Sequence, residues 1–319
     1  MKNFLKLSLF FFATLGTLIA NAATHQNYGG QSMVAPLQKV LVKRPDNAYA
    51  NADPKIWHYT AKPDLKNAQR EHDAFVNLLK QNDIQVFYHN EYLPTLADAI
   101  YVHDPVIITN QGAIILRMGK DLRRGEEEAI EKKLNQLGIP TFFKLEGEAT
   151  AEGGDTLWVD ERTLAVGHSF RTNQAGIKQL RDGLSKIGVE VIEVQLPYDQ
   201  GKEACLHLQS LISLVDYRKA VVYKKLMPVS FVQYLEKKGF KLIDVDDDEY
   251  LTMGPNILTL KPNLVLTIKG NHKIKRNLEE NGVRVLTYEG DDISLKAEGG
   301  ATCLTRPILR GPMRETFSI

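Results

Sequence analysis

The feature that most constrains the fold is a pattern of short strands and amphipathic helices that recurs five times along the chain. Each repetition contains two short β-rich runs, an amphipathic helix and a further short run, over roughly 50–60 residues. Units of this kind bury their faces against neighbouring units, so the pattern predicts one quasi-symmetric α/β assembly. An open doubly wound sheet would also explain alternating strands and helices.

The individual elements follow from the same periodicities. The expected strands cover residues 39–42, 84–88, 100–109, 113–117, 141–144, 155–159, 163–166, 190–194, 206–213, 219–223, 241–245, 257–260, 264–268, 284–288 and 302–309. The expected helices cover residues 67–81, 125–137, 173–187, 229–238 and 272–281. No helix follows the final strand, which could therefore close a ring. Since no long or Pro-rich linker separates the units, we expect a single domain over residues 37–319.

The N-terminal segment is typical of a secretory signal peptide. A positively charged start is followed by an apolar stretch from Leu7 to Ala20 and by the small-x-small sequence Ala20-Asn21-Ala22. We expect cleavage after Ala22, which predicts a periplasmic or secreted protein. An uncleaved anchor is the alternative, but the apolar stretch is shorter than the ~20 residues that usually span a bilayer. Residues 23–36 are expected to form a flexible lead-in.

Composition narrows the classes of partner. The chain has 40 Lys and Arg against 39 Asp and Glu, and this balance supplies no basic field for a nucleic acid. No later segment is apolar enough to cross a bilayer, so the mature protein is expected to be soluble outside the cytoplasm, and the sequence allows a homo-oligomer. The only two cysteines, Cys205 and Cys303, could pair, but they do not form a disulfide framework. At least one of them could serve for its reactivity.

Cys303 and His207 are the candidate catalytic pair. Cys303 follows Gly299-Gly300, which permits a tight turn and the close approach of a ligand, so its thiol is placed like a nucleophile. Taken alone it would more often be a small buried hydrophobe, and only its candidate partners favour the catalytic role. His207 lies on an expected strand between two leucines, and alternation would place its ring on the opposite face from theirs. A neutral imidazole near a thiol can accept or return a proton. Cys205 is a rival nucleophile, but no glycine turn precedes it.

Two acidic residues lie in similar structured contexts. Asp104 precedes Pro105, and Glu152 precedes Gly153-Gly154. Taken singly, Asp104 could form a turn before proline and Glu152 could be a solvated loop carboxylate. Two carboxylates beside a thiol and an imidazole, however, suit a planar cation, because carboxylates accept guanidinium N–H groups in a fork geometry.

Six short motifs resemble the guanidine-modifying superfamily of arginine deiminases, amidinotransferases and dimethylarginine dimethylaminohydrolases, and most of all the last of these. They occur in the expected order over the whole expected mature chain: Asp98-x5-Asp104, Leu122-Arg123-Arg124-Gly125-Glu126, Glu152-Gly153-Gly154-Asp155, Arg171-Thr172-Asn173-Gln174-x-Gly176, Leu206-His207-Leu208 and Thr302-Cys303. The resemblance implies a five-bladed α/β-propeller of ββαβ units. It also implies that no metal or organic cofactor is needed.

The resemblance further assigns roles at the site. It implies Cys303 as nucleophile and His207 as general acid and base, with Asp104 and Glu152 holding the guanidinium. A covalent thiouronium would form and be hydrolysed to citrulline. Three residues would bind the rest of the substrate: Arg123 and Arg171 would bind the α-carboxylate, and Asp98 would contact the amino end or support the site.

The sequence departs from the family pattern at two positions, which affects the expected substrate. His103 stands where the dimethylarginine enzymes often carry glutamate and the deiminases arginine. Gln209 stands where the deiminases and amidinotransferases carry aspartate, which argues against a plain arginine deiminase. An amidinotransferase, a secreted cysteine peptidase and a non-catalytic arginine-binding protein remain alternatives to the hydrolase.

Overall fold

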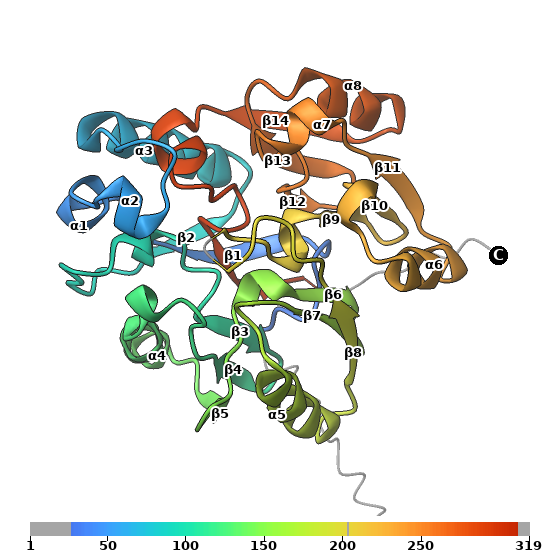
Figure 1. The fold of residues 1–319 in the computed structure, drawn as a ribbon, viewed down its shortest axis with the longest axis horizontal. Helices are drawn as coiled ribbons and strands as arrows, with labels where there is room; N and C mark the ends of the chain where they lie inside the picture. Colours follow the sequence, from blue (N-terminus) through green and yellow to red (C-terminus); the bar gives the residue numbers. More distant parts are fainter. Residues whose placement is uncertain (1–26, 203, 312–319) are drawn as a thin grey trace, which may run out of the picture.

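The strands assemble into five separate three-stranded sheets rather than into one continuous sheet, and none of the five closes on itself. The structure is a computed structural model that describes residues 27–202 and 204–311. Figure 1 shows the sheets placed around a common centre, with the longer helices on the outside. The predicted mixed α/β architecture is therefore confirmed. The signal peptide expected over residues 1–22 lies outside the described residues.

In every sheet the middle strand pairs antiparallel with one neighbour and parallel with the other. The sheets are β15–β1–β2 (Arg306–Arg310, Leu37–Val42, Gln85–Tyr88), β3–β4–β5 (Val106–Thr109, Gly112–Ile115, Thr141–Lys144), β6–β7–β8 (Thr156–Asp160, Thr163–His168, Glu190–Gln195), β9–β10–β11 (Ile212–Asp216, Lys219–Val222, Lys241–Asp244) and β12–β13–β14 (Leu258–Lys261, Leu264–Ile268, Arg284–Tyr288). The first sheet contains both the first and the last strand, because β15 pairs with β1.

A helix connects the two parallel strands of each sheet, as a parallel crossover requires. These helices are α3 (Leu65–Gln81), α4 (Glu126–Gln136), α5 (Gln174–Ser185), α6 (Val229–Lys237) and α8 (His272–Glu280). Their apolar faces are buried, as Ile274 and Leu278 in α8 illustrate by lying one turn apart. Side-chain caps begin two of them: Asp64 accepts a hydrogen bond from a first-turn amide of α3, and Asn173 does the same for α5.

Several shorter helices were not predicted from the sequence. They are α1 (Asn47–Ala50), α2 (Pro54–Trp57), α7 (Asp247–Tyr250), the 3₁₀ turns Ala97–Ile100, Asp121–Arg123, Gly153–Asp155, Leu208–Ser210 and Lys224–Leu226, and the π-helical segment Asp291–Leu295. Each is too short to show a clear periodicity, since one turn contributes at most two residues to an apolar face.

Three of the predicted strands begin too early. The strands expected over 100–109, 206–213 and 302–309 begin only at Val106, Ile212 and Arg306, and turns precede them. His207 therefore caps a 3₁₀ turn, and the expected alternation with its neighbouring leucines is wrong. Polar side chains and backbone groups in these segments form hydrogen bonds with one another across the centre of the molecule. These hydrogen bonds keep the segments out of the strands, despite their β-like composition.

The segment expected to be a flexible lead-in packs against the body from Asn27 onward. Gly29 exchanges backbone hydrogen bonds with the last strand, and Val34 and Ala35 are buried. Within residues 27–202 and 204–311, no helix combines the length and apolar character that crossing a bilayer would require.

Candidate active site

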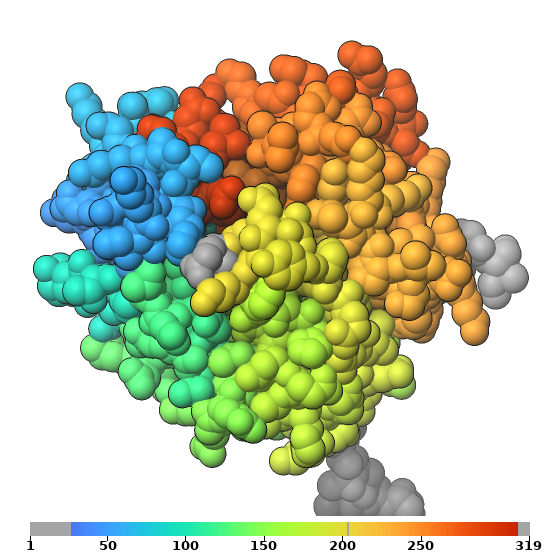
Figure 2. All heavy atoms as spheres, viewed as in Figure 1, coloured from blue at the N-terminus to red at the C-terminus, as the bar shows by residue number. Residues whose placement is uncertain are grey.

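The turns that precede the first strands of the sheets meet at a cavity of about 170 Å³. Its lining includes Asp98, Asp104, Lys120, Arg123, Arg171, Cys205, His207, Asn256 and Cys303. Asp199 and Gln200 also line the cavity, and Figure 2 shows the yellow part of the chain, around residue 200, near the centre of this face, to the right of the blue part and below the red part. Of the predicted site residues only Glu152 is absent from this lining, and it is fully buried next to His207.

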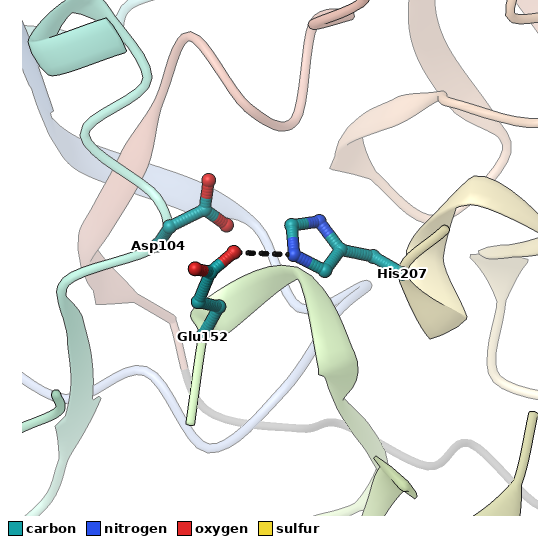
Figure 3. A group of neighbouring side chains, drawn as sticks. All are labelled: Asp104, Glu152 and His207. Carbon is teal, nitrogen blue, oxygen red and sulfur yellow. Dashed lines mark hydrogen bonds and ion pairs between the residues drawn. The ribbon is translucent and has the colours of Figure 1, made fainter. Parts of the chain in front are cut away.

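His207, Glu152 and Asp104 form a buried cluster (Figure 3). Nε2 of His207 lies 2.7 Å from Oε2 of Glu152, and the other carboxylate oxygen of Glu152 accepts hydrogen bonds from the amides of Gly119 and Lys120. Burial opposes ionisation of Glu152, but the hydrogen bond from His207 and the charge of Arg171 hold the pKa of Glu152 well below its usual value. Burial likewise opposes protonation of His207, yet its contacts with Cys205, Asp104 and Glu152 raise its pKa well above the usual value.

The two glycines after Glu152 are required by close contacts. A Cβ atom on Gly153 would lie 2.1 Å from the backbone oxygen of His103, and one on Gly154 would lie 2.3 Å from Nδ1 of His207. The Gly154 amide also donates a hydrogen bond to Asp104. The absence of a side chain at Gly154 therefore lets the imidazole of His207 approach the backbone.

Cys303 lies in the turn before β15 and is partly exposed to the cavity. The side-chain amide of Asn256 donates a hydrogen bond to its sulfur at 3.3 Å, and the oxygen of the same amide accepts one from the Thr302 backbone. Burial and the negative charge of Asp104 raise the pKa of the Cys303 thiol to about 12. Without a bound cation, Cys303 is therefore a neutral thiol at physiological pH.

Cys205 is exposed, and its sulfur lies 3.5 Å from Nδ1 of His207. Both cysteines are free thiols, so the two are not joined by a disulfide. Cys205 and His207 lie side by side in the irregular segment that precedes the 3₁₀ turn Leu208–Ser210.

Arg123 is buried and its donors are engaged by the protein. It bonds Asp104 at 2.6 Å and Glu126 through two parallel contacts of 3.0 and 2.8 Å, and it also donates to the Tyr101 carbonyl. Burial raises the pKa of Glu126 to about 7, although Arg123 opposes the rise. A substrate carboxylate would have to displace one of these acceptors from Arg123. Arg171 is less constrained, with its guanidinium 3.6 Å from Glu152.

Asp98 is held by two neighbours that sequence reasoning missed. Tyr59 donates to one carboxylate oxygen at 2.6 Å, and Lys120 contacts the other at 2.7 Å. Lys120 also lies 4.9 Å from the centre of the Trp57 ring. No local signal in the sequence marked Tyr59 or Asn256, since each is distant along the chain from its partner. Lys120 is also distant from Asp98, but it lies just before the Leu122–Glu126 motif.

His103 and Gln209 lie behind the cavity and contact each other. Nε2 atoms of the two side chains are 3.0 Å apart, and Gln209 also donates to the backbone oxygens of Gly153 and Thr156. Burial and the charge of Arg306 lower the pKa of His103 to about 3, so its ring is neutral. Nδ1 of His103 then donates to the Thr305 carbonyl, and Nε2 accepts from Gln209.

The carboxylate and imidazole cluster could also suit a metal ion by spacing alone. The ligand atoms of Asp104, Glu152 and His207 lie within 4.8 Å of one another. Arg123 contacts Asp104 and Arg171 approaches Glu152, and these two positive groups oppose a divalent cation at the same place. The arrangement therefore suits a singly charged planar cation better than a metal.

Comparison with known proteins agrees with this chemistry. The sequence profile of the family described as "N,N dimethylarginine dimethylhydrolase, eukaryotic" matches residues 39–310. The N(G),N(G)-dimethylarginine dimethylaminohydrolase of Pseudomonas aeruginosa is 26% identical over 249 residues, which cover 77% of this chain and 91% of that protein. An arginine deiminase of Bacillus cytotoxicus is 24% identical over 264 residues, covering 69% of this chain and 63% of that protein.

The fold agrees as well. A structure of the Pseudomonas aeruginosa enzyme complexed with citrulline superposes with a TM-score of 0.71 at 23% identity, covering 85% of this chain and 98% of that one. The match over residues 39–310 includes every predicted site residue. The chain therefore belongs to the N,N-dimethylarginine dimethylhydrolase family of the guanidine-modifying superfamily, and it is an amidine hydrolase that acts on carbon–nitrogen bonds.

Proposed function

We propose that the chain hydrolyses dimethylarginine or arginine to citrulline plus an amine or ammonia, with Cys303 as the nucleophile. One observation carries the proposal: thiols, an imidazole, carboxylates and two arginines line one cavity. The family supports the reaction class, and the names of the relatives supply the candidate substrates.

The charges suggest how such a substrate binds. Its guanidinium lies against Asp104 and Glu152, whose carboxylates are buried and can fix a planar cation. Arg171 binds the substrate carboxylate, because the donors of Arg123 are engaged by Asp104, Glu126 and a backbone carbonyl. Arg123 then acts mainly by holding Asp104. Asp98 contacts the amino end of the substrate from its position beside Lys120.

The reaction needs a thiolate that the ligand-free site disfavours. A bound guanidinium is a positive charge next to Cys303, and it lowers the thiol pKa from its value of about 12, so that the thiol releases its proton to solvent while His207 stays protonated. The thiolate then adds to the guanidinium carbon, His207 gives its proton to the departing amine or ammonia, and a covalent thiouronium remains. Water, deprotonated by His207, attacks the same carbon, and citrulline leaves as the carbon–sulfur bond breaks.

Alternatives within the fold differ in the group that resolves the intermediate or the substrate that enters. An arginine deiminase would use arginine alone, and a glycine-type amidinotransferase would use an amine instead of water. A non-catalytic arginine-binding protein would bind arginine without forming citrulline. A cysteine peptidase is disfavoured, because one carboxylate, Glu152, suffices to orient His207, and the second buried carboxylate, Asp104, suits a cationic substrate rather than a neutral peptide bond.

A citrulline assay with purified protein separates these cases. Arginine, monomethylarginine, dimethylarginine and agmatine are supplied in parallel, with and without glycine as an acceptor. The proposal predicts citrulline from at least one of the three carboxylate-bearing compounds. It also predicts much slower ammonia release from agmatine, which lacks the carboxylate and would yield carbamoylputrescine instead of citrulline. Guanidinoacetate formed only when glycine is present would indicate an amidinotransferase instead, and binding without any turnover would indicate a binding protein.

Three further properties belong to the proposal. The five sheets, with first and last strands paired, support a five-bladed α/β-propeller in a single domain over residues 37–319. The N-terminal sequence supports export to the periplasm or the medium with cleavage after Ala22. We propose that the protein works on a small guanidino compound without a cofactor, as a monomer or a homo-oligomer.

A further inference from the structure

We propose that a second, smaller cavity behind the active site binds a small monovalent anion such as chloride between Arg306 and Arg310. This site is separate from the one used in the proposed reaction. Its lining includes His103, Thr156, Thr259, Thr302, Arg306 and Arg310, and none of the residues around it lines the active-site cavity.

The argument starts from two buried arginines on the last strand. Arg306 and Arg310 both lie on β15, and both line this cavity. Only 6% and 7% of their surfaces are exposed. Buried guanidinium groups are normally paired with a carboxylate, because removing an unpaired charge from water is costly.

These two arginines bond only neutral backbone oxygens. Arg306 donates to the His103 carbonyl, and Arg310 donates to the carbonyls of Ala35 at 2.7 Å and Thr259 at 2.9 Å. The Nε atom of each is buried without an acceptor, and within residues 27–202 and 204–311 neither forms a salt bridge. Asp104 is the one carboxylate whose charge reaches Arg306, but its oxygens already accept from Arg123 and from the Gly154 amide.

The contrast with Arg123 shows what is missing. Arg123 is equally buried, but Glu126 and Asp104 compensate its charge and hold the pKa of its guanidinium well above the usual value. Burial instead lowers the pKa of Arg306 and of Arg310 to about 9, and the two positive charges also disfavour each other at Arg306. An anion placed between them would supply the compensation that no described carboxylate gives.

The size of the cavity selects the anion. Its free volume of about 20 Å³ accommodates a species about as large as a water molecule. Halide ions are near this size, whereas phosphate, sulfate and organic carboxylates are larger. The remaining lining is apolar or neutral, which suits a weakly hydrated monovalent anion better than a multiply charged one.

Crystals grown without halide and soaked in sodium bromide test the site directly. We expect an anomalous bromine peak between the two guanidinium groups, and its absence at saturating bromide would overturn the proposal. In solution, chloride should raise the melting temperature by about 2–4 °C for each tenfold increase above its dissociation constant. Gluconate, which is too large, should give no such rise at the same ionic strength.

Variants keep the solution test specific. Arg310→Met should remove most of the response to chloride, and Arg310→Lys should retain part of it. Arg284→Met, at an exposed arginine on β14, is the matched control and should respond like the unmodified protein. An equal chloride response in Arg310→Met and in the control would contradict the site. If Arg310→Met fails to fold, the bromide experiment on the unmodified protein still decides.

Discussion

The two cysteines lie at the same cavity but in different surroundings. Cys205 is exposed and touches the His207 ring, whereas Cys303 is partly enclosed, accepts a hydrogen bond from Asn256 and lies within the field of Asp104. Contact with an imidazole alone would favour Cys205. Enclosure beside acidic groups favours Cys303, because a cationic substrate must be drawn to the nucleophile and must in turn stabilise the thiolate. The surroundings of a thiol are thus more informative here than its nearest neighbour.

Substituting each cysteine in turn should give the largest difference in activity between the two sites. Cys303→Ala should lower kcat for citrulline formation by roughly 10⁴-fold or more, since the covalent step is lost. Cys205→Ala should keep activity within a small factor. Steady-state kinetics and a melting curve for each variant check both statements. If Cys205→Ala is the inactive variant, the assignment of the nucleophile is reversed.

Alkylation should distinguish the two thiols without any substitution. At Cys303, chloroacetamidine, which carries a positive amidinium, should react roughly 10–10³-fold faster than neutral chloroacetamide, because a nearby cation lowers the thiol pKa by about 1–3 units. Chloroacetamide should react with Cys303 faster as the pH rises toward about 12, because only the thiolate is reactive. Peptide mapping measures both rates, and an equal preference for the two reagents at Cys303 would contradict the acid-lined site.

How much of this was visible in the sequence differs between the fold and the site. The five units were predictable because strands such as β13 and β14 follow simple periodicities, and both begin and end where expected. The starts of three strands were not predictable. Residues 100–105, 206–211 and 302–305 have a β-like composition, but contacts across the centre of the molecule keep them out of the strands. These segments carry Asp104, His207 and Cys303.

The motifs nevertheless identified the residues that come together at the cavity. Their partners escaped, since Asn256 and Tyr59 are linked to Cys303 and Asp98 only through the folded chain. The engagement of Arg123 by Asp104 and Glu126 also depends on rotamers that a sequence does not specify.

The binding side of the cavity can be tested through Arg171. Arg171→Ala should raise KM for arginine or dimethylarginine by roughly 10–100-fold while changing kcat little, because a charged hydrogen bond to the substrate carboxylate is lost. Agmatine, without that carboxylate, is the internal control, and its kcat/KM should hardly change. A fall in kcat with unchanged KM would indicate that Arg171 instead serves Glu152, which it approaches within 3.6 Å.

The smallest effect is expected at Asn256. The hydrogen bond from Asn256 to the Cys303 sulfur lowers the thiol pKa. Asn256→Ala removes this hydrogen bond, so the thiol pKa should rise and kcat/KM should fall by roughly tenfold. The pH dependence of kcat/KM should shift to higher pH, a change that a purely structural role would not cause. The matched substitution Asn281→Ala, at the end of α8, should leave the profile unchanged.

The central claim is that the Cys303 sulfur becomes covalently bonded to the guanidinium carbon of the substrate. Acid quenching during steady-state turnover, followed by proteolysis and mass spectrometry, tests it most directly. The account predicts an adduct of the substrate less its departing amine on the peptide that contains Cys303. Citrulline production with the adduct on the Cys205 peptide, or with no adduct on either cysteine under conditions that trap it in other enzymes of this chemistry, would contradict the account.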